Sequence, residues 1–262
     1  MPAIGVIGGS GLYEMEGLEV LEERLIKTPY GEPSAPFCIA NFEEQTLAFL
    51  PRHGLRHNIH PHLVNYRANL WAMRELGVER IFSVCSTGGI TEDMAPGALV
   101  VLDQVIDWTQ GARASTFYGD DKVVHVDFTE PFCPELRGAL LSASRDLAIE
   151  AKDGGTYLCV NGPRLESRAE IEFFKGAGAH VVGMTGMPEA ALARELEICY
   201  SSLAVVTNRA AGITGQKLTT TEVVDTMKQA RLSIEGLIKR ALSNIPPKRA
   251  CRCKDALKDS EL

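Results

Sequence analysis

The chain has 262 residues, 45% hydrophobic and 23% charged, which are the proportions of a soluble globular protein with a core of its own. Its 27 basic and 34 acidic residues give a formal net charge of −7, which argues against nucleic-acid binding by bulk charge. An anionic ligand would need a local basic site. The N-terminal stretch lacks the features of a secretory signal, and no apolar run approaches about 20 residues, so we expect a cytoplasmic protein without a membrane anchor.

The chain opens with an apolar stretch at residues 3–7, which predicts a buried strand. The turn Gly8-Gly9-Ser10-Gly11 follows it. Bare backbone N–H groups in a glycine-rich turn can approach an anion, so this turn is a candidate phosphate cradle. A tight turn with a purely structural role fits the motif equally well. The dinucleotide-binding pattern GxGxxG does not fit, because Glu14 would stand at its last glycine.

Residues 18–50 alternate and contain turn signals, which predicts antiparallel strands. The segment 51–62 then holds four of the six histidines and two arginines. A solvated surface loop is one interpretation, and a metal site is another, although no carboxylate or cysteine lies nearby in the sequence. We favour an anion-binding loop in which the Arg52 guanidinium makes a bidentate contact to phosphate.

Helical periodicity follows from His62 to Leu76, and a strand is predicted at residues 78–84. We expect this strand to end in a second small-residue turn, Cys85-Ser86-Thr87-Gly88-Gly89. The turn is either structural or, as we favour, contacts phosphate and sugar through Cys85 and Ser86. No activating partner of Cys85 is evident, so we do not expect its thiol to act as a nucleophile.

The middle of the chain is predicted to contain one strand at residues 98–106 and then the long irregular segment 107–135. A loop of this length usually has a function or lies at an interface. Its one histidine, His125, is first interpreted as an ordinary loop residue.

A helix at residues 134–151, a strand at 156–160 and a second helix ending at Lys175 are predicted next. Glu166 lies near the start of the second helix. Its carboxylate is either a first-turn acid favoured by the helix macrodipole or an acceptor for an N–H group of a ligand.

The segment 183–213 combines a small-residue loop, a helical pattern at residues 187–197 and an apolar strand that ends at Asn208. Polar groups at strand ends are typical of ligand sites in open α/β sheets. The Thr185 hydroxyl and the free N–H groups of the following helix are expected to hold an anion. The Asn208 amide offers the acceptor and donors needed to read the edge of a heterocycle.

A long amphipathic helix is expected at residues 218–241, with a threonine N-cap at 219, 220 or 221. Periodicity is then lost, so we divide the chain into one domain, 1–245, and a polar tail, 246–262. The tail contains Cys251-Arg252-Cys253 and is interpreted as solvated chain or as a CxC disulfide. The cysteines at 38, 133, 159 and 199 are expected to be separate small core or loop residues, and no cysteine or histidine pair has zinc spacing, so no metal site is expected.

Several motifs in this order resemble the trimeric purine nucleoside phosphorylase superfamily, in its branch of methylthioadenosine and methylthioinosine phosphorylases. They are RHG at 52–54, GPRLE at 162–166, GMTGMPEAALARE at 183–195 and TNRAAG at 207–212. The resemblance extends to about residue 244. It implies an α/β fold, with a single domain built on a central mixed β-sheet flanked by helices. It also implies reversible phosphorolysis of a purine nucleoside in purine salvage, with inorganic phosphate as co-substrate and no metal or organic cofactor.

Carried over residue by residue, the resemblance implies two adjoining sets of ligands. The phosphate set is Ser10, Arg52, His53, Cys85, Ser86 and Thr185. The nucleoside set is Leu165, Glu166, Met184, Asn208, Ala210, Thr220 and His125. Asn208, Arg52 and His53 are the implied catalytic residues. The resemblance also implies a homotrimer or a dimer of trimers with active sites near subunit interfaces, where His125 reaches into the neighbouring subunit.

Glu166 and Asn208 decide the expected base. They match the pair that binds hypoxanthine and guanine, whereas methylthioadenosine phosphorylases have an uncharged residue and an aspartate there. The resemblance therefore favours S-methyl-5'-thioinosine, inosine or guanosine as substrate. Thr220 stands where ordinary trimeric purine nucleoside phosphorylases have a histidine, which leaves the 5' group open. A methylthioadenosine phosphorylase, a hydrolytic nucleosidase and a nucleoside-binding protein are the alternatives.

Overall fold

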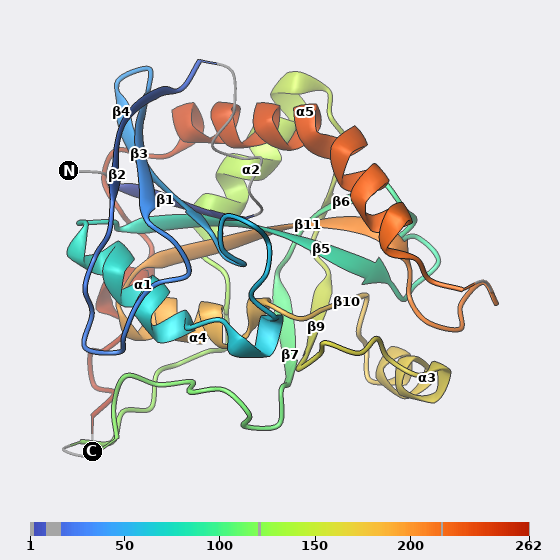
Figure 1. Ribbon diagram of the computed structural model, residues 1–262. Coiled ribbons are helices and arrows are strands. Elements are labelled where there is room, and N and C mark those ends of the chain that lie inside the picture. Colours follow the sequence, from blue (N-terminus) through green and yellow to red (C-terminus); the bar gives the residue numbers. More distant parts are fainter. Residues whose placement is uncertain (1–2, 9–16, 120–121, 216, 262) are drawn as a thin grey trace.

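The computed structural model describes residues 3–8, 17–119, 122–215 and 217–261 (Figure 1). Within these residues one mixed sheet of eleven strands runs in the order β2-β3-β4-β1-β5-β10-β9-β7, and β11, β6 and β8 continue from β5. The strands are β1 (Ile4–Gly8), β2 (Glu19–Arg24), β3 (Phe37–Phe42), β4 (Gln45–Pro51), β5 (Arg80–Gly89), β6 (Leu99–Val101), β7 (Gln104–Trp108), β8 (Ala151–Asp153), β9 (Thr156–Val160), β10 (Val181–Gly183) and β11 (Cys199–Arg209).

Helices cover both faces of the sheet (Figure 1). They are α1 (Tyr66–Glu75), α2 (Pro134–Leu147), α3 (Arg168–Gly176), α4 (Gly186–Glu195) and α5 (Thr220–Asn244), with short 3-10 turns η2 (Pro61–Leu63) and η3 (Arg252–Asp255). One large apolar cluster packs α1 and α4 against the sheet, and a second packs α2 and α5 against the opposite face. This arrangement confirms the predicted α/β domain with a central mixed sheet flanked by helices.

The two longest strands, β5 and β11, form the centre of the sheet. They pair in parallel from Cys199 opposite Arg80 to Arg209 opposite Gly89, with a register shift between Val206 and Asn208. Parallel strands buried on both faces read as near-continuous apolar runs, which is why the β11 sequence was recognisable. The bulge interrupts the alternation of side chains and changes the direction of the Asn208 side chain at the carboxyl end of the strand.

Two predicted boundaries are wrong. Residues 85–89 do not form a turn but continue β5, because β11 pairs with them along one edge and β10 pairs with Gly88 and Gly89 along the other. The single strand predicted at 98–106 is two strands, of which β6 pairs with β11 and β8, and β7 pairs with β9. The chain changes partners at Leu102 and Asp103, where the Asp103 carboxylate accepts the Gly155 N–H at 2.7 Å.

The tail after α5 packs against the core. Cys251 and Cys253 are only 7% and 2% exposed, so the interpretation of these residues as solvated chain is wrong. They meet Cys133 and Cys199, which are therefore not separate core cysteines. All four are free thiols in this structure, so the disulfide interpretation of the CxC motif is not observed. In the part of the chain that is described, no helix has the length and apolar character needed to cross a membrane.

Gly89 offers a test of the central strand. A Cβ at this position would lie 1.9 Å from the Met94 carbonyl oxygen, a contact that only backbone movement can relieve. We expect Gly89→Ala to lower the free energy of unfolding by at least about 1–3 kcal/mol, the usual range for overpacking.

The matched control is Gly138→Ala in α2, an exposed position with nothing within 4 Å of the added Cβ. That change should raise stability by up to about 1 kcal/mol, because alanine is the better helix former. Urea unfolding of both variants compares them, and a Gly89→Ala variant as stable as the parent would contradict this account of the strand.

Candidate functional site

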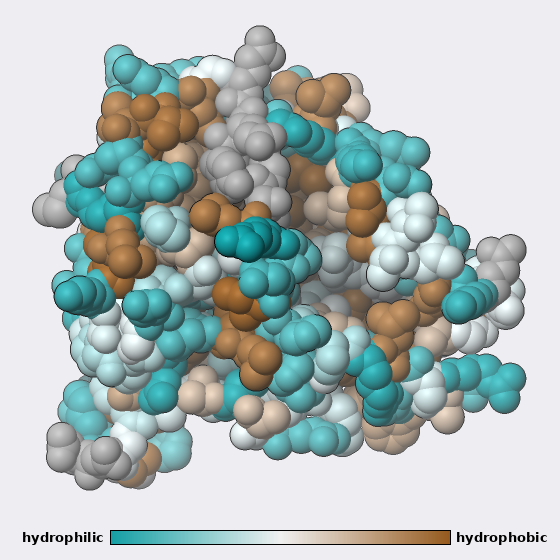
Figure 2. Space-filling model, viewed as in Figure 1, coloured by the Kyte–Doolittle hydropathy of each residue, from teal (hydrophilic) through white to brown (hydrophobic). Residues whose placement is uncertain are grey.

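A cavity of about 960 Å³ opens at the carboxyl ends of β5 and β11. Figure 2 shows the face on which the surface is hollowed beside α5. The cavity brings together most of the predicted site residues, namely Arg52, His53, Cys85, Ser86, Leu165, Glu166, Met184, Thr185, Asn208 and Ala210. Since parallel strands end at one edge of the sheet, residues far apart in the sequence converge there.

Three predicted residues are not assembled in this cavity. Ser10 lies outside the described residues. Thr220 is an exposed residue at the start of α5, and the residues that line the cavity of this chain do not include it. Its helix is capped by Thr219, one of the three threonines considered, in a capping box with Glu222. His125 is also exposed, and its backbone N–H donates to the Ser260 carbonyl at 2.8 Å. Its expected role across a subunit interface remains a prediction.

The Arg52 guanidinium is held by the protein itself. Its Nε and Nη2 donate to the two carboxylate oxygens of Glu189 at 2.7 and 2.8 Å. Nη2 also donates to Ser83 Oγ at 2.7 Å, and Nη1 donates to the Val84 carbonyl at 3.2 Å. The predicted bidentate contact of Arg52 to phosphate is therefore wrong, because that edge of the guanidinium faces Glu189. Of its five N–H groups, these bonds leave one, on Nη1, for a ligand.

Glu189 is the buried partner that sequence reasoning missed. It is 0% exposed, and it also accepts hydrogen bonds from Tyr200 Oη at 2.8 Å and Ser83 Oγ at 3.1 Å. Burial alone would lower the pKa of Arg52, but the Glu189 charge outweighs it and raises that pKa above its usual value. Arg52 and Glu189 form a buried ion pair whose polar atoms are hydrogen-bonded, as the burial of such a pair requires. In the sequence, Glu189 looks like any acidic residue in a first helical turn.

His53 lies beside this pair as a neutral imidazole. Burial, the charge of Arg52 and the neighbouring His57 lower its pKa to about 4, against a weaker opposing effect of the hydrogen bond to Ile59. Its Nδ1 is 2.8 Å from the Ile59 carbonyl, which can only accept, so Nδ1 carries the proton. Nε2 then has a lone pair. His53 can accept a hydrogen bond from a protonated phosphate oxygen or a sugar hydroxyl, but it adds no positive charge near pH 7.

The N-terminus of α4 is not a free anion site. The N–H groups of Thr185 and Gly186 donate to Tyr157 Oη at 3.0 and 3.3 Å, and that of Met187 donates to Cys159 Sγ at 3.3 Å. The expectation that an anion binds at the N–H groups of these three residues is therefore wrong, because Tyr157 and Cys159 already accept their hydrogen bonds. The Thr185 side chain makes no capping bond and lines the cavity, so its hydroxyl is the group left for a ligand.

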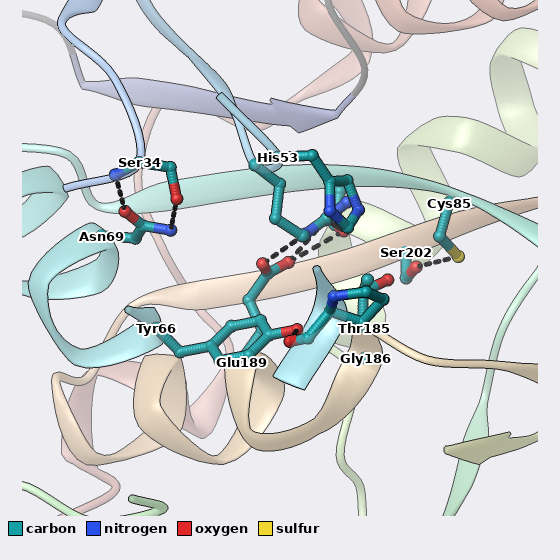
Figure 3. Close-up of polar contacts among 12 residues, drawn as sticks. Ser34, His53, Tyr66, Asn69, Cys85, Thr185, Gly186, Glu189 and Ser202 are labelled. Carbon is teal, nitrogen blue, oxygen red and sulfur yellow. Dashed lines mark hydrogen bonds and ion pairs between the residues drawn. The ribbon is translucent and has the colours of Figure 1, made fainter. Parts of the chain in front are cut away.

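Cys85 and Ser86 both line the cavity, but their side chains differ in their ability to contact a ligand. The Cys85 thiol turns to Ser202 Oγ at 3.6 Å (Figure 3), and burial raises its pKa to about 11. This thiol is therefore a poor nucleophile, as expected from the sequence. Ser86 is exposed and lines the cavity.

Glu166 belongs to the cavity rather than to the following helix. The N-cap of α3 is Ser167, and the carboxylate in its first turn is Glu170, which completes a capping box. This excludes the interpretation of Glu166 as the first-turn acid. Its side chain lines the cavity, and burial raises its pKa. Across the same cavity, Asn208 Nδ2 donates to its neighbour's carbonyl, that of Arg209, at 2.8 Å.

Arg113 positions the loop that carries Met184. Its Nη1 donates to the carbonyls of Met184 and Met187 at 2.8 and 2.6 Å, and its Nη2 donates to that of Asn161 at 2.9 Å. This side chain, only 8% exposed, joins the loops after β9 and β10. A lone arginine in the irregular segment 107–135 gives no signal of this role in the sequence.

Fold and cavity define an α/β protein that takes a small ligand at the carboxyl ends of its central strands. Residues 3–243 match the Phosphorylase superfamily. The chain therefore belongs to this superfamily.

Individual relatives are similar to this chain over nearly its whole length. It is 53% identical over 257 residues to the probable S-methyl-5'-thioinosine phosphorylase of Thermodesulfovibrio yellowstonii, covering 98% of this chain and 96% of that protein. It is 49% identical over 265 residues to the 6-oxopurine nucleoside phosphorylase of Pyrococcus furiosus, covering 98% of each. The crystal structure of a methylthioadenosine phosphorylase from an antarctic soil metagenomic library is similar with a TM-score of 0.94 at 36% identity, covering 100% of this chain and 92% of that one.

The buried pair predicts a strong effect of charge removal. Glu189→Gln leaves the Arg52 guanidinium buried without a counter-charge, and we expect it to lower the free energy of unfolding by about 3–5 kcal/mol. Glu195→Gln is the matched control, since this buried carboxylate in the same helix accepts the Phe117 N–H at 2.8 Å and burial raises its pKa. Neutralising it should change stability far less. Urea unfolding near pH 7 measures both, and equal effects would contradict the importance of the pair.

Proposed function

We propose that this protein is a cytoplasmic purine nucleoside phosphorylase of purine salvage. It cleaves 6-oxopurine nucleosides with phosphate and releases the free base and ribose 1-phosphate or its 5-methylthio analogue. S-methyl-5'-thioinosine, inosine and guanosine are the proposed substrates. The observation that carries the proposal is that one cavity is lined both by Glu166 and Asn208 and by the phosphate candidates His53, Ser86 and Thr185. The names of the relatives support the same class of reaction.

Phosphate in this proposal is held mainly by neutral groups. The hydroxyls of Ser86 and Thr185 and the one remaining N–H of Arg52 donate to it. His53 Nε2 accepts a hydrogen bond from the protonated oxygen of the phosphate and thereby turns an unprotonated oxygen toward the sugar. Cleavage of the N-glycosidic bond builds positive charge on the sugar, and the phosphate acts as nucleophile and as counter-charge. Because the Arg52 charge is already neutralised by Glu189, little of the phosphate charge is cancelled by the protein.

The purine leaves with negative charge, which the other end of the cavity stabilises. Asn208 hydrogen-bonds the purine at N7 and O6, and at O6 its amide donates, because a 6-oxo oxygen can only accept. One of its two amide N–H groups donates to the Arg209 carbonyl, which leaves the other for the base. Preorganised donors aimed at developing charge are usually the largest catalytic contribution. Glu166 accepts the N1–H, which 6-oxopurines have and adenine lacks.

We further propose that the active enzyme is a homotrimer or a dimer of trimers. The exposed position of His125, far along a segment that is held to the tail, suits a residue that completes a neighbour's site. No resident cofactor is included in the proposal.

Phosphate dependence tests the reaction class. We expect hypoxanthine to be released from inosine or methylthioinosine in the presence of phosphate, and none in its absence. Chromatography of the products, with ribose 1-phosphate or its methylthio analogue as the second product, measures this. Release of base without phosphate would indicate a nucleosidase, and no release under either condition would indicate a nucleoside-binding protein.

Base selectivity tests the role of Glu166 and Asn208. Adenine presents a lone pair to the Glu166 carboxylate, and such mispaired polar groups typically cost about 1–3 kcal/mol each, more when charged. We expect kcat/KM for methylthioadenosine to be lower than for methylthioinosine by at least a few hundredfold on that scale.

Asn208→Asp, alone or with Glu166→Ser, should shift the preference toward adenine nucleosides, because a protonated aspartate can donate to N7 while accepting from the 6-amino group. Asn58→Asp, at another residue lining the cavity, is the matched control and should leave the ratio unchanged. A wild-type enzyme that uses both nucleosides equally would refute the proposed base recognition.

A further inference from the structure

Four cysteines from three distant parts of the chain meet at one point. Cys133 is the N-cap of α2, Cys199 is the first residue of β11, and Cys251 and Cys253 lie at the start of η3 in the tail. Their sulfur atoms all lie within 4.8 Å of one another, and all four residues are buried. We call this group the cysteine cluster. It lies in the apolar layer between α2, α5 and the sheet, away from the residues that line the cavity.

The spacing of the sulfur atoms suits a metal ion. In a tetrahedral zinc site the Zn–S distance of about 2.3 Å places neighbouring sulfurs about 3.8 Å apart. The Cys199 and Cys251 sulfurs are 3.3 Å apart, and every other pair in the cluster lies within 4.8 Å. Four sulfur ligands are the donor set of structural zinc sites. The other buried thiols differ, since Cys85 contacts a serine hydroxyl and Cys159 contacts the backbone of Met187.

A positive charge lies beside the cluster. Arg194 Nη1 is 3.9 Å from Cys253 Sγ. Two disulfides would be uncharged and would gain little from a guanidinium, whereas a zinc ion with four thiolates carries a net charge of −2. Buried charge of that size needs a nearby cation. The arginine therefore favours a metal thiolate centre over a pair of disulfides.

We propose that the cysteine cluster binds one Zn²⁺ ion as a tetrathiolate. The four thiols give their protons to solvent, four Zn–S bonds form, and no atom changes oxidation state. All four positions are filled by protein ligands, so the site is closed and its role is structural.

The site would fasten the tail to the core. Two ligands come from the tail, one from the N-terminus of α2 and one from β11. The tail in turn holds the segment 107–135, through the hydrogen bond from His125 N–H to the Ser260 carbonyl. Zinc would thus fix the position of the loop that is proposed to reach a neighbouring subunit. Metal binding of this kind adds directly to folding stability.

Wild-type protein tests the proposal first. Purified anaerobically with reductant and exposed to zinc, it should contain one zinc per chain by elemental analysis. After denaturation in chelator without further reductant, all seven cysteines should react as free thiols. Cobalt in place of zinc should give the intense thiolate charge-transfer and visible bands of a tetrahedral tetrathiolate. Absence of bound zinc after reconstitution, or three reactive thiols with four cysteines in disulfides, would overturn the proposal.

Variants locate the ion. Cys251→Ser with Cys253→Ser should abolish zinc binding and lower the Tm, while Cys38→Ser, at a buried cysteine of β3 outside the cluster, should retain the full metal content. Chelation should lower the Tm of the wild type and of Cys38→Ser, but not that of the double variant. Zinc retained by the double variant would refute the site. If the double variant does not fold, the cobalt spectrum of the wild type decides the matter.

Discussion

The buried ion pair between Arg52 and Glu189 is the interaction on which the site depends. It joins the end of β4 to the first regular turn of α4, and through Ser83 and Tyr200 it also ties in the two central strands. A charge in that position without its partner would be strongly unfavourable, so the two elements can pack only with both side chains in place. Their packing brings the His53 loop and the Thr185 loop to the same cavity.

The pair also sets the electrostatic character of the phosphate end. A guanidinium that is neutralised by a carboxylate contributes hydrogen bonds but little net charge. With His53 neutral as well, we propose that the anion is held by hydroxyls and N–H groups in a protein whose net charge is already −7. For a reaction that develops positive charge on the sugar, this has a physical advantage. The negative charge of the phosphate can then stabilise the positive charge on the sugar. An arginine without a carboxylate partner would cancel part of that negative charge.

The opposite end of the cavity depends on backbone geometry. A bulge in β11 redirects Asn208, and the capping box of Ser167 and Glu170 satisfies the start of α3 without Glu166. The Asn208 and Glu166 side chains both line the cavity. Arg113 joins the loops after β9 and β10 by donating to the carbonyls of Asn161 and of the cavity-lining Met184. The two ends of the cavity therefore differ in chemistry. The phosphate end offers neutral hydrogen-bonding groups, whereas the base end carries the Glu166 carboxylate.

The sequence by itself determined the fold class, the central strands and ten of the residues that line the cavity. These signals are local or ordered along the chain: apolar strands read directly, and short motifs placed His53, Glu166, Thr185 and Asn208. Only the tertiary structure decided which side chains contact one another inside the protein. The sequence predicts a bidentate phosphate contact for Arg52, but Nε and Nη2 of its guanidinium donate to Glu189. This pair could not be predicted, because an acid 137 residues away in the sequence leaves no local trace. The contact of Cys133 and Cys199 with the tail could not be predicted either. Contacts across the core depend on how helices and strands pack and not on spacing in the chain.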